Sequence, residues 1–198
     1  MPNYIGTGLP EIPAAQYIDW VPIQSQTASG VASLAFTGMN SDFDEYKFEF
    51  VNMHPATDNV TFGFQVNAPG AGAAADFNET ITSSYFRAKH NEDDSAVSLD
   101  YVADFDQPQG TAYQVLPNEV GYDSDQSTSG VLTIYAPSST TYVKHFQARF
   151  NDAHPSDIHM DCFIAGYVNT TTAIDEINFK FSSGNIDAGT ITMYGLSK

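Results

Sequence analysis

Residues 174–196 have the sequence IDEINFKFSSGNIDAGTITMYGL, and this segment decides the fold class. Its INFKF part alternates apolar and polar residues, and this period of two places an apolar row on one face of a β-strand. The SSGN part predicts a chain reversal, because Gly and Asn adopt positive φ at little cost. The TITMY part predicts a returning strand, and Gly189 just before it predicts a β-bulge or a close backbone approach. The segment therefore predicts a C-terminal β-hairpin that closes an all-β domain.

The same alternation recurs through the chain from residue 27 onward. In YKFEFVNM, Tyr46, Phe48 and Phe50 share one face of a predicted strand, and the V, L and Y of AVSLDYVA align in the same way. Strands are also predicted at VASLAFTG, VTFGFQV, ITSSYFRAK, VLTIYAP, TYVKHFQARF and MDCFIAGYV, and no stretch has a convincing helical period. Roughly eight to ten strands at such spacing predict an antiparallel β-sandwich of two packed sheets over residues 27–198.

The composition fits one ordered domain with an acidic surface. A chain of 198 residues is long enough for a single all-β domain, and 14 Phe and 11 Tyr residues supply bulky side chains for its core. The formal net charge is −17, from 24 acidic and 7 basic residues. Nucleic acid and anionic membrane surfaces are excluded as partners, because binding them requires a cationic surface. The acidic surface is compatible with saline surroundings, with cation binding or with a basic partner.

Residues 1–26 differ in composition from the rest of the chain. Prolines at positions 2, 10, 13 and 22 remove backbone donors and keep the preceding residues out of helical angles, so this segment is predicted to be an extended arm. The arm is too apolar for a free linker, and we expect it to lie against its own domain, a neighbouring copy or another protein. The apolar residues that we assign to this contact are Tyr4, Ile5, Ile12, Tyr17, Ile18 and Trp20.

The sequence contains no catalytic or cofactor-binding signature. Motifs for a serine nucleophile elbow, a phosphate-binding loop and a zinc-binding helix are all absent. Cys162 lies inside a predicted strand and cannot form an internal disulfide, because it is the only cysteine of the chain. We therefore expect a buried, inert thiol and a protein that is not an enzyme. The alternative is a glycosidase with paired carboxylates, and the sequence gives no spacing that supports it.

Acidic and histidine residues gather in several predicted turns. Calcium takes about six to eight oxygen ligands, which acidic loops at the end of a sandwich supply together with backbone carbonyls. No turn here matches a calcium-binding loop motif, so the acidic turns are weak candidates. His154 and His159 flank another loop, where a zinc site is the alternative to a solvated loop. The calcium candidates are Asp42, Asp44, Asp93, Asp94, Asp123 and Asp125.

The sequence predicts neither a membrane span nor a secretion signal. Its apolar runs are shorter than the ~20 residues of a membrane span, and the first residues, MPNYIGTGLPEIP, lack a basic start and an apolar segment. We therefore expect a protein that is made in a cytoplasm and leaves it by lysis or as part of a particle.

The stretches FTGMNSDFDEYKFEFVNMHPATDNVTFGFQV and FKFSSGNIDAGTITMYGL combine strand and turn motifs at residues 36–38, 46–60 and 183–195. In these motifs the chain resembles a group of small virion proteins of tailed bacteriophages, especially marine ones. The resemblance covers the chain from residue 27 onward. It implies a jelly-roll sandwich of the concanavalin-like kind that serves as a capsid decoration or tail-fibre component, and it provides no catalytic residues.

The resemblance and the residue patterns together predict a capsid decoration (cement) protein on the head surface. We expect a homotrimer that binds the major capsid protein or another virion protein and lies on the virion surface after assembly in the host cytoplasm. The alternative is a tail-fibre or receptor-binding module that recognises a host glycan through loops at one end of the sandwich. Exposed aromatic side chains stack on sugars in such modules, and the candidates here are Tyr85, Phe86, Tyr113, Tyr122 and Tyr167.

Overall fold

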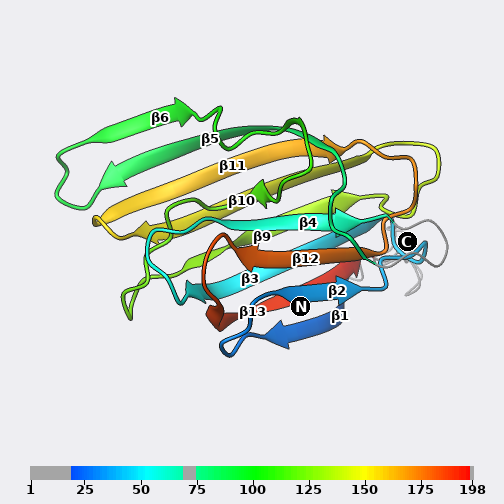
Figure 1. Cartoon of the computed structure of the whole chain (residues 1–198), viewed down its shortest axis with the longest axis horizontal. Helices are drawn as coiled ribbons and strands as arrows, with labels where there is room; N and C mark the ends of the chain where they lie inside the picture. Colours follow the sequence, from blue (N-terminus) through cyan, green and yellow to red (C-terminus); the bar gives the residue numbers. More distant parts are fainter. Residues whose placement is uncertain (1–18, 69–74, 197–198) are drawn as a thin grey trace, which may run out of the picture.

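The structure is a computed structural model that describes residues 19–68 and 75–196, and these residues form thirteen strands in two antiparallel sheets (Figure 1). The predicted antiparallel β-sandwich is therefore confirmed. The larger sheet contains β1 (Trp20–Thr27), β3 (Glu45–Pro55), β5 (Ile81–Asn91), β6 (Val97–Tyr101), β7 (Pro108–Gly110), β9 (Thr128–Tyr135), β10 (Lys144–His154), β11 (Ile158–Val168) and β13 (Ile186–Leu196). The smaller sheet contains β2 (Leu34–Thr37), β4 (Phe62–Asn67), β8 (Gln114–Val115) and β12 (Glu176–Phe181).

The strand order shows which segments lie side by side. The larger sheet has the order β1-β13-β3-β9-β10-β11-β5-β6, and β7 also pairs with β5. The smaller sheet has the order β2-β12-β4-β8 and lies over part of the larger one (Figure 1). β1 thus forms one edge of the larger sheet, and β6 with the short β7, both paired with β5, forms the other. In the described part of the chain, no helix is long and apolar enough to cross a membrane.

Phenylalanine rings form the centre of the core between the two sheets. The ring centroid of Phe179, on β12, lies 5.0 Å from that of Phe50 and 5.4 Å from that of Phe48, both on β3 of the larger sheet. Phe36 and Phe62, from the smaller sheet, surround the same ring at 6.1 and 6.3 Å. Burial of each such ring stabilises the sandwich by roughly 1.5–3 kcal/mol. Their alternation with polar residues therefore determines which side of each strand faces inward.

The C-terminal segment forms two strands, as predicted, but they do not form a hairpin. β12 pairs with β2 and β4 in the smaller sheet, whereas β13 pairs with β1 and β3 in the larger sheet. The turn at residues 182–185 therefore leads from one sheet to the other. The hairpin prediction is wrong because alternation specifies the buried face of a strand and not its hydrogen-bonded neighbour. Phe179 and Met193 face the same core from opposite sheets.

Two glycines allow the backbone geometry of this segment. Gly184 has a φ of 72° in the turn, and Gly189 has a φ of 117° inside β13. The register between β13 and β3 shifts on both sides of residue 188, next to Gly189. A Cβ atom at Gly189 would lie 2.7 Å from the carbonyl oxygen of Asn52 and from the Cα of Met53. The predicted bulge and the predicted close backbone approach are both confirmed.

The larger sheet begins before the predicted boundary between arm and domain at residues 26 and 27. β1 pairs with β13 from Trp20 to Thr27. Pro22 lies in this edge strand, where a missing backbone donor is tolerated, and the register shifts between Pro22 and Gln24. These two irregularities hide the strand in the sequence pattern, so residues 20–26 were wrongly assigned to the arm. The arm residues Tyr4, Ile5, Ile12, Tyr17 and Ile18 lie outside the described residues.

Candidate binding surface

The larger sheet has one face against the smaller sheet and an outer face, which we define as the face turned away from the smaller sheet. Alternation places Phe86, Phe163 and Arg149 on the outer face, at adjoining register positions of β5, β11 and β10. The next row along these strands has smaller or uncharged side chains, including Ala165 and Gln147. The difference in size between the two rows produces a groove that runs across the strands.

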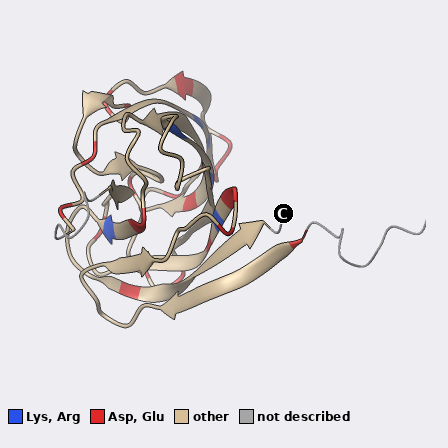
Figure 2. Ribbon diagram, turned by 90° about the vertical axis from the view of Figure 1, so that its right-hand side faces the viewer, with Lys and Arg blue, Asp and Glu red and all other residues tan. Residues whose placement is uncertain are grey.

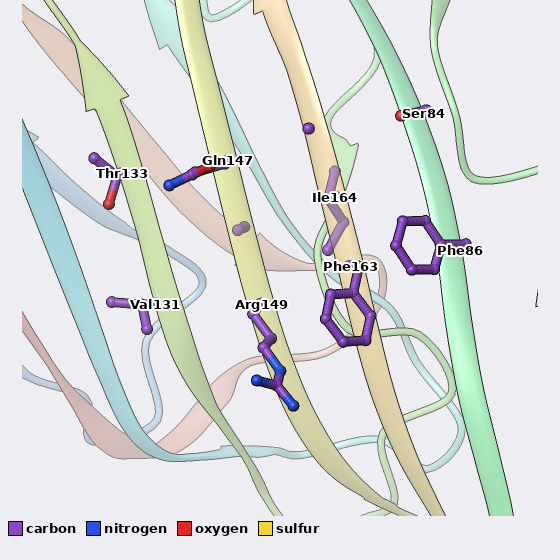
Figure 3. A pocket seen from close by; sticks show the side chains of 10 residues that line it. Ser84, Phe86, Val131, Thr133, Gln147, Arg149, Phe163 and Ile164 are labelled. Carbon is purple, nitrogen blue, oxygen red and sulfur yellow. The ribbon is translucent and has the colours of Figure 1, made fainter. Parts of the chain in front are cut away.

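This groove has a volume of about 430 Å³ and combines an apolar wall with uncharged polar groups (Figure 3). The rings of Phe86 and Phe163 stack with centroids 4.9 Å apart and planes 4° apart. The guanidinium of Arg149 lies 4.8 Å from the centroid of Phe163 and donates from Nε and Nη2 to the Asp161 carboxylate at 2.9 and 2.7 Å. The two opposite charges compensate each other. The uncharged polar side chains in the groove are those of Ser84, Thr133 and Gln147.

The outer face continues as an exposed apolar row on the edge strand β6. Val97, Leu99 and Tyr101 are 71%, 73% and 61% exposed. Tyr101 pairs with Phe86 on β5, so the row adjoins the aromatic wall of the groove. The hydroxyl of Tyr101 donates to Asp106 at 2.6 Å. The alignment of this row was predicted correctly, but its exposure was not predictable, because an apolar row has the same sequence pattern in a core and on an uncovered face.

Trp20 is the only apolar arm residue of our set that the structure describes, and it packs on its own domain. The ammonium group of Lys47 lies 4.6 Å from the ring centroid of Trp20 and 5.0 Å from that of Tyr194. The same ammonium group lies 2.7 Å from Oε1 of Glu49. Trp20, Lys47 and Tyr194 are half-buried, and each cation–π contact of this kind contributes on the order of 1 kcal/mol. The role of Trp20 in binding a partner stays a prediction.

The structure does not bring the five aromatic sugar-binding candidates together. Phe86 lines the groove and is 41% exposed, and Tyr122 is 51% exposed in a loop. Tyr85 is fully buried in the core. The phenol of Tyr113 donates a hydrogen bond to the smaller sheet, and Tyr167 packs edge-on against a histidine of β10. Only Phe86 therefore belongs to the groove.

The calcium candidates lie in three separate turns, and Figure 2 shows acidic residues spread over the molecule. Asp93 accepts a hydrogen bond from the backbone N–H of Ser95 at 3.0 Å, and Asp94 lies 3.1 Å from Nε2 of His90. Within residues 19–68 and 75–196, no group of three or more histidine, cysteine or acidic side chains is placed to hold a metal ion. A calcium site stays a prediction. The candidates precede β3 (Asp42, Asp44), connect β5 to β6 (Asp93, Asp94) and precede β9 (Asp123, Asp125).

The two histidines considered for zinc have different partners. His154 Nε2 lies 3.8 Å from Oε2 of Glu119, and burial lowers the pKa of His154. His159 Nδ1 lies 2.9 Å from Nδ2 of Asn151. These contacts orient the two imidazoles toward separate neighbours rather than toward one common point.

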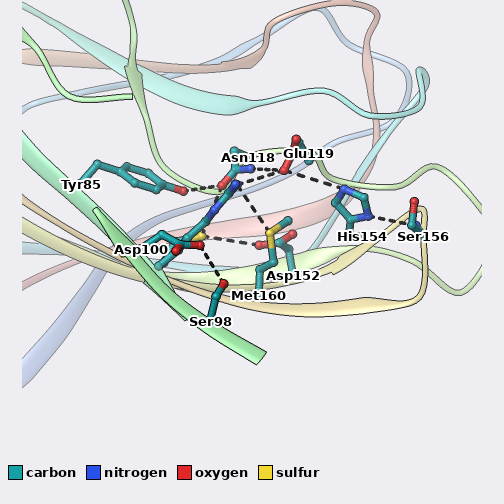
Figure 4. Close-up of polar contacts among 11 residues, drawn as sticks. Tyr85, Ser98, Asp100, Asn118, Glu119, Asp152, His154, Ser156 and Met160 are labelled. Carbon is teal, nitrogen blue, oxygen red and sulfur yellow. Dashed lines mark hydrogen bonds and ion pairs between the residues drawn. The ribbon is translucent and has the colours of Figure 1, made fainter. Parts of the chain in front are cut away.

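A cluster of polar side chains lies inside the sandwich (Figure 4). The hydroxyl of Tyr85 donates to Oδ1 of Asn118 at 2.8 Å, and Nη1 of Arg87 donates to Oε2 of Glu119 at 2.9 Å. Asp152 is 2% exposed, and its Oδ2 has no hydrogen-bond partner among the residues described. Burial raises the pKa of Asp152 to about 8, so this carboxyl group is mostly uncharged at neutral pH.

Cys162 belongs to the same cluster, and its predicted burial is confirmed. Its Sγ lies 3.8 Å from Oδ1 of Asp152, and burial raises the pKa of the thiol to about 12. The sequence analysis missed Asp152, although a signal was present. Asp152 continues the inward alternation of Phe146, Ala148 and Phe150 on β10, so a carboxyl group occupies a core position.

The outer face of the larger sheet, with its groove and its exposed β6 row, is therefore the candidate binding surface. In the polar cluster, Tyr85, Asn118, Asp152 and Cys162 are buried, and they do not belong to this outer face. Comparison with protein families gives no match for this chain, and comparison with curated proteins gives none either.

Proposed function

We propose that this chain is a non-enzymatic structural protein of a bacteriophage particle, bound to the head surface as a decoration protein. The observation that carries the proposal is the unpartnered apolar row of Val97, Leu99 and Tyr101, each more than half exposed. Contiguous exposed apolar surface on a folded domain is typical of a protein-binding site. The resemblance to small phage virion proteins points to the same function, and the β-sandwich that it implies is the fold observed here.

Decoration requires surface contact and no bond-making. The proposed contacts bury the outer face of the larger sheet and residues 1–18 against the major capsid protein or another virion protein, and against neighbouring copies in a trimer. Burial of apolar surface contributes roughly 25 cal/mol per Å² before the costs of association, so the added interface helps the shell to resist the pressure of packaged DNA. The net charge of −17 favours a partner with a basic surface.

The copy number of the chain in purified particles tests the assignment to the head. A decoration protein is expected at hundreds of copies per particle, whereas a tail component is expected at a few dozen or fewer. Densitometry of a stained gel, calibrated against the major capsid protein, distinguishes the two. A copy number in the lower range overturns the assignment to the head.

Deletion of residues 1–18 tests the arm without removing part of the sheet, because β1 begins at Trp20. The shortened chain is expected to keep its melting temperature and to lose binding to undecorated capsids. A matched control replaces residues 1–18 by a Gly/Ser segment of equal length, which separates loss of the apolar side chains from loss of chain length. Undiminished binding of the deletion variant refutes the role of the arm.

A tail-fibre or receptor-binding module that recognises a host glycan is the second candidate. The groove beside Phe86 and Phe163 favours it, because sugars present C–H groups to apolar walls and hydroxyl groups to uncharged polar side chains. Titration of the pure protein with host surface polysaccharide tests it. Gln147→Ala in the groove is expected to weaken binding, whereas Val51→Ala, at an exposed position of β3, is the matched control. Equal effects of both substitutions, or no binding at all, remove this candidate.

A further inference from the structure

The edge strand β6 presents unpaired backbone groups. No other strand in the described part of the chain pairs with the side of β6 that faces away from β5. The backbones of Ala96 and Val102 form hydrogen bonds with β5 at the two ends of β6. Because hydrogen-bonded and non-hydrogen-bonded pairs alternate in antiparallel sheets, Val97, Leu99 and Tyr101 direct their N–H and C=O groups away from β5. These groups are available to a further strand.

The same three residues supply exposed apolar side chains, so one short segment offers both backbone and side-chain contacts. An extended segment that adds to a sheet edge gains affinity from main-chain hydrogen bonds and specificity from alternate side chains. Edge strands are usually protected by proline, by bulges or by charged side chains. β1, at the opposite edge, has Pro22 and a register shift, whereas β6 has neither and carries one charged residue, Asp100, on the face opposite to its apolar row.

Acidic residues lie at both ends of β6. Glu92, Asp93 and Asp94 belong to the turn before the strand, and Asp104 and Asp106 belong to the turn after it. A second copy that paired with β6 in antiparallel orientation would bring the acidic turns of the two copies together, and parallel pairing would do the same. Repulsion between these acidic turns disfavours the pairing of two copies. Basic residues at both ends of an incoming segment, in contrast, are attracted to the acidic turns.

We propose that β6 is the docking site for an extended segment of a partner protein, which adds to the larger sheet as a further strand. This segment alternates apolar and polar residues, and Lys or Arg residues flank it at both ends. Its apolar side chains lie beside Val97, Leu99 and Tyr101 on the outer face. The inference rests on the proposed function only for the identity of the partner, because the geometry and charge of the site are properties of this chain alone.

Two synthetic peptides test the proposal on the full chain. Both alternate valine and threonine over the length of β6, and one is flanked by two lysines at each end, the other by two glutamates. The lysine-flanked peptide is expected to bind at least tenfold more tightly in isothermal titration. This preference is expected to shrink at about 1 M salt, where the Debye length is about 3 Å. Equal affinity for the two peptides, or no binding of either, overturns the proposal.

Substitution at Leu99 separates strand addition from non-specific apolar contact. Leu99→Pro removes the outward N–H without removing a hydrogen bond to β5, whereas Leu99→Thr keeps this N–H and introduces a β-branched side chain, which suits a strand. Leu99→Pro is expected to abolish binding of the lysine-flanked peptide. Leu99→Thr is expected to retain it within about threefold, since the main-chain hydrogen bonds remain. Binding that is unchanged by Leu99→Pro contradicts strand addition.

Hydrogen exchange on the unaltered chain keeps the test decisive if Leu99→Pro fails to fold. The amide groups of Leu99 and Tyr101 are expected to exchange more slowly when the lysine-flanked peptide is added, while the amides of Val21 and Thr27 on β1 keep their rates. Unchanged exchange at Leu99 overturns the proposal. A high copy number on particles together with no peptide binding would leave head decoration standing and remove only the docking role of β6.

Discussion

Replacing Asp152 by Asn tests whether the buried carboxyl group is uncharged in the folded protein. Asp152 is 2% exposed and has one oxygen without a hydrogen-bond partner among the described residues. Burial, which disfavours the charged form, raises its pKa from 3.8 to about 8. Asn has nearly the same shape and does not titrate. The substitution therefore removes the titration of this site with little change in packing.

The sign of the effect follows from the proton that the folded protein holds. Between pH 4 and pH 8 the folded state keeps a proton on Asp152 that the unfolded state has released, so the free energy of unfolding falls as pH rises. The fall amounts to about 1.4 kcal/mol per pH unit, or about 2.7 kcal/mol between pH 5 and pH 7. Asp152→Asn lacks this contribution. The stability of the variant relative to the unaltered protein is therefore expected to rise by about this amount over the same interval.

Urea unfolding followed by circular dichroism at pH 5, 6 and 7 measures this difference. His154 and the other titratable groups are present in both proteins, so their contributions largely cancel when the two free energies are subtracted. Asp125→Asn, in an exposed turn, is the control for loss of one negative charge at the surface. Parallel pH dependence of the unaltered protein and Asp152→Asn would refute the reasoning and would mean that Asp152 is charged in the core.

Three further substitutions test the packing, the backbone and the surface. Phe179→Ala is expected to lower the free energy of unfolding by about 3–5 kcal/mol, because the ring is buried between the sheets, and a loss below about 1 kcal/mol in urea unfolding contradicts this. Gly189→Ala is expected to lower the free energy of unfolding by about 1–3 kcal/mol, because the φ of Gly189 is positive and the new methyl group meets the carbonyl of Asn52. An unchanged melting temperature argues against this strain. Arg149→Ala is expected to lower the free energy of unfolding by less than about 1 kcal/mol, since Arg149 is largely exposed to solvent in its ion pair with Asp161. A loss above about 2 kcal/mol in urea unfolding contradicts this and shows a structural role.

The fold class follows from the sequence, whereas the pairing of strands does not. The alternation at Phe48, Phe50 and Phe179 fixed the inward faces, and these rings do meet in the core. The same alternation gave a hairpin for β12 and β13, which belong to different sheets. A period of two describes how one strand is buried, and two strands that face each other across a core satisfy it as well as two hydrogen-bonded neighbours. β1 was missed because Pro22 and a register shift interrupt its pattern.

The candidate surface was predicted less well than the fold, for a related reason. The aligned row at Val97 and Leu99 was evident in the sequence, but the sequence does not show that this row lies on an uncovered face. The groove depends on contacts between residues far apart in sequence, such as Phe86 and Phe163, and therefore on the order of strands in the sheet. Asp152 could have been found, because an acidic residue at an inward position of a strand indicates a buried polar group.

The reaction of the single buried thiol with a reagent measures how often the folded protein opens. Cys162 is enclosed in the core, and burial raises its pKa to about 12, so a thiol-specific reagent in neutral solution reaches and reacts with it only after the two layers separate. The rate of labelling then reports how often the interior is transiently accessible. Because the chain has no second cysteine, the signal comes from one known position at the centre of the fold.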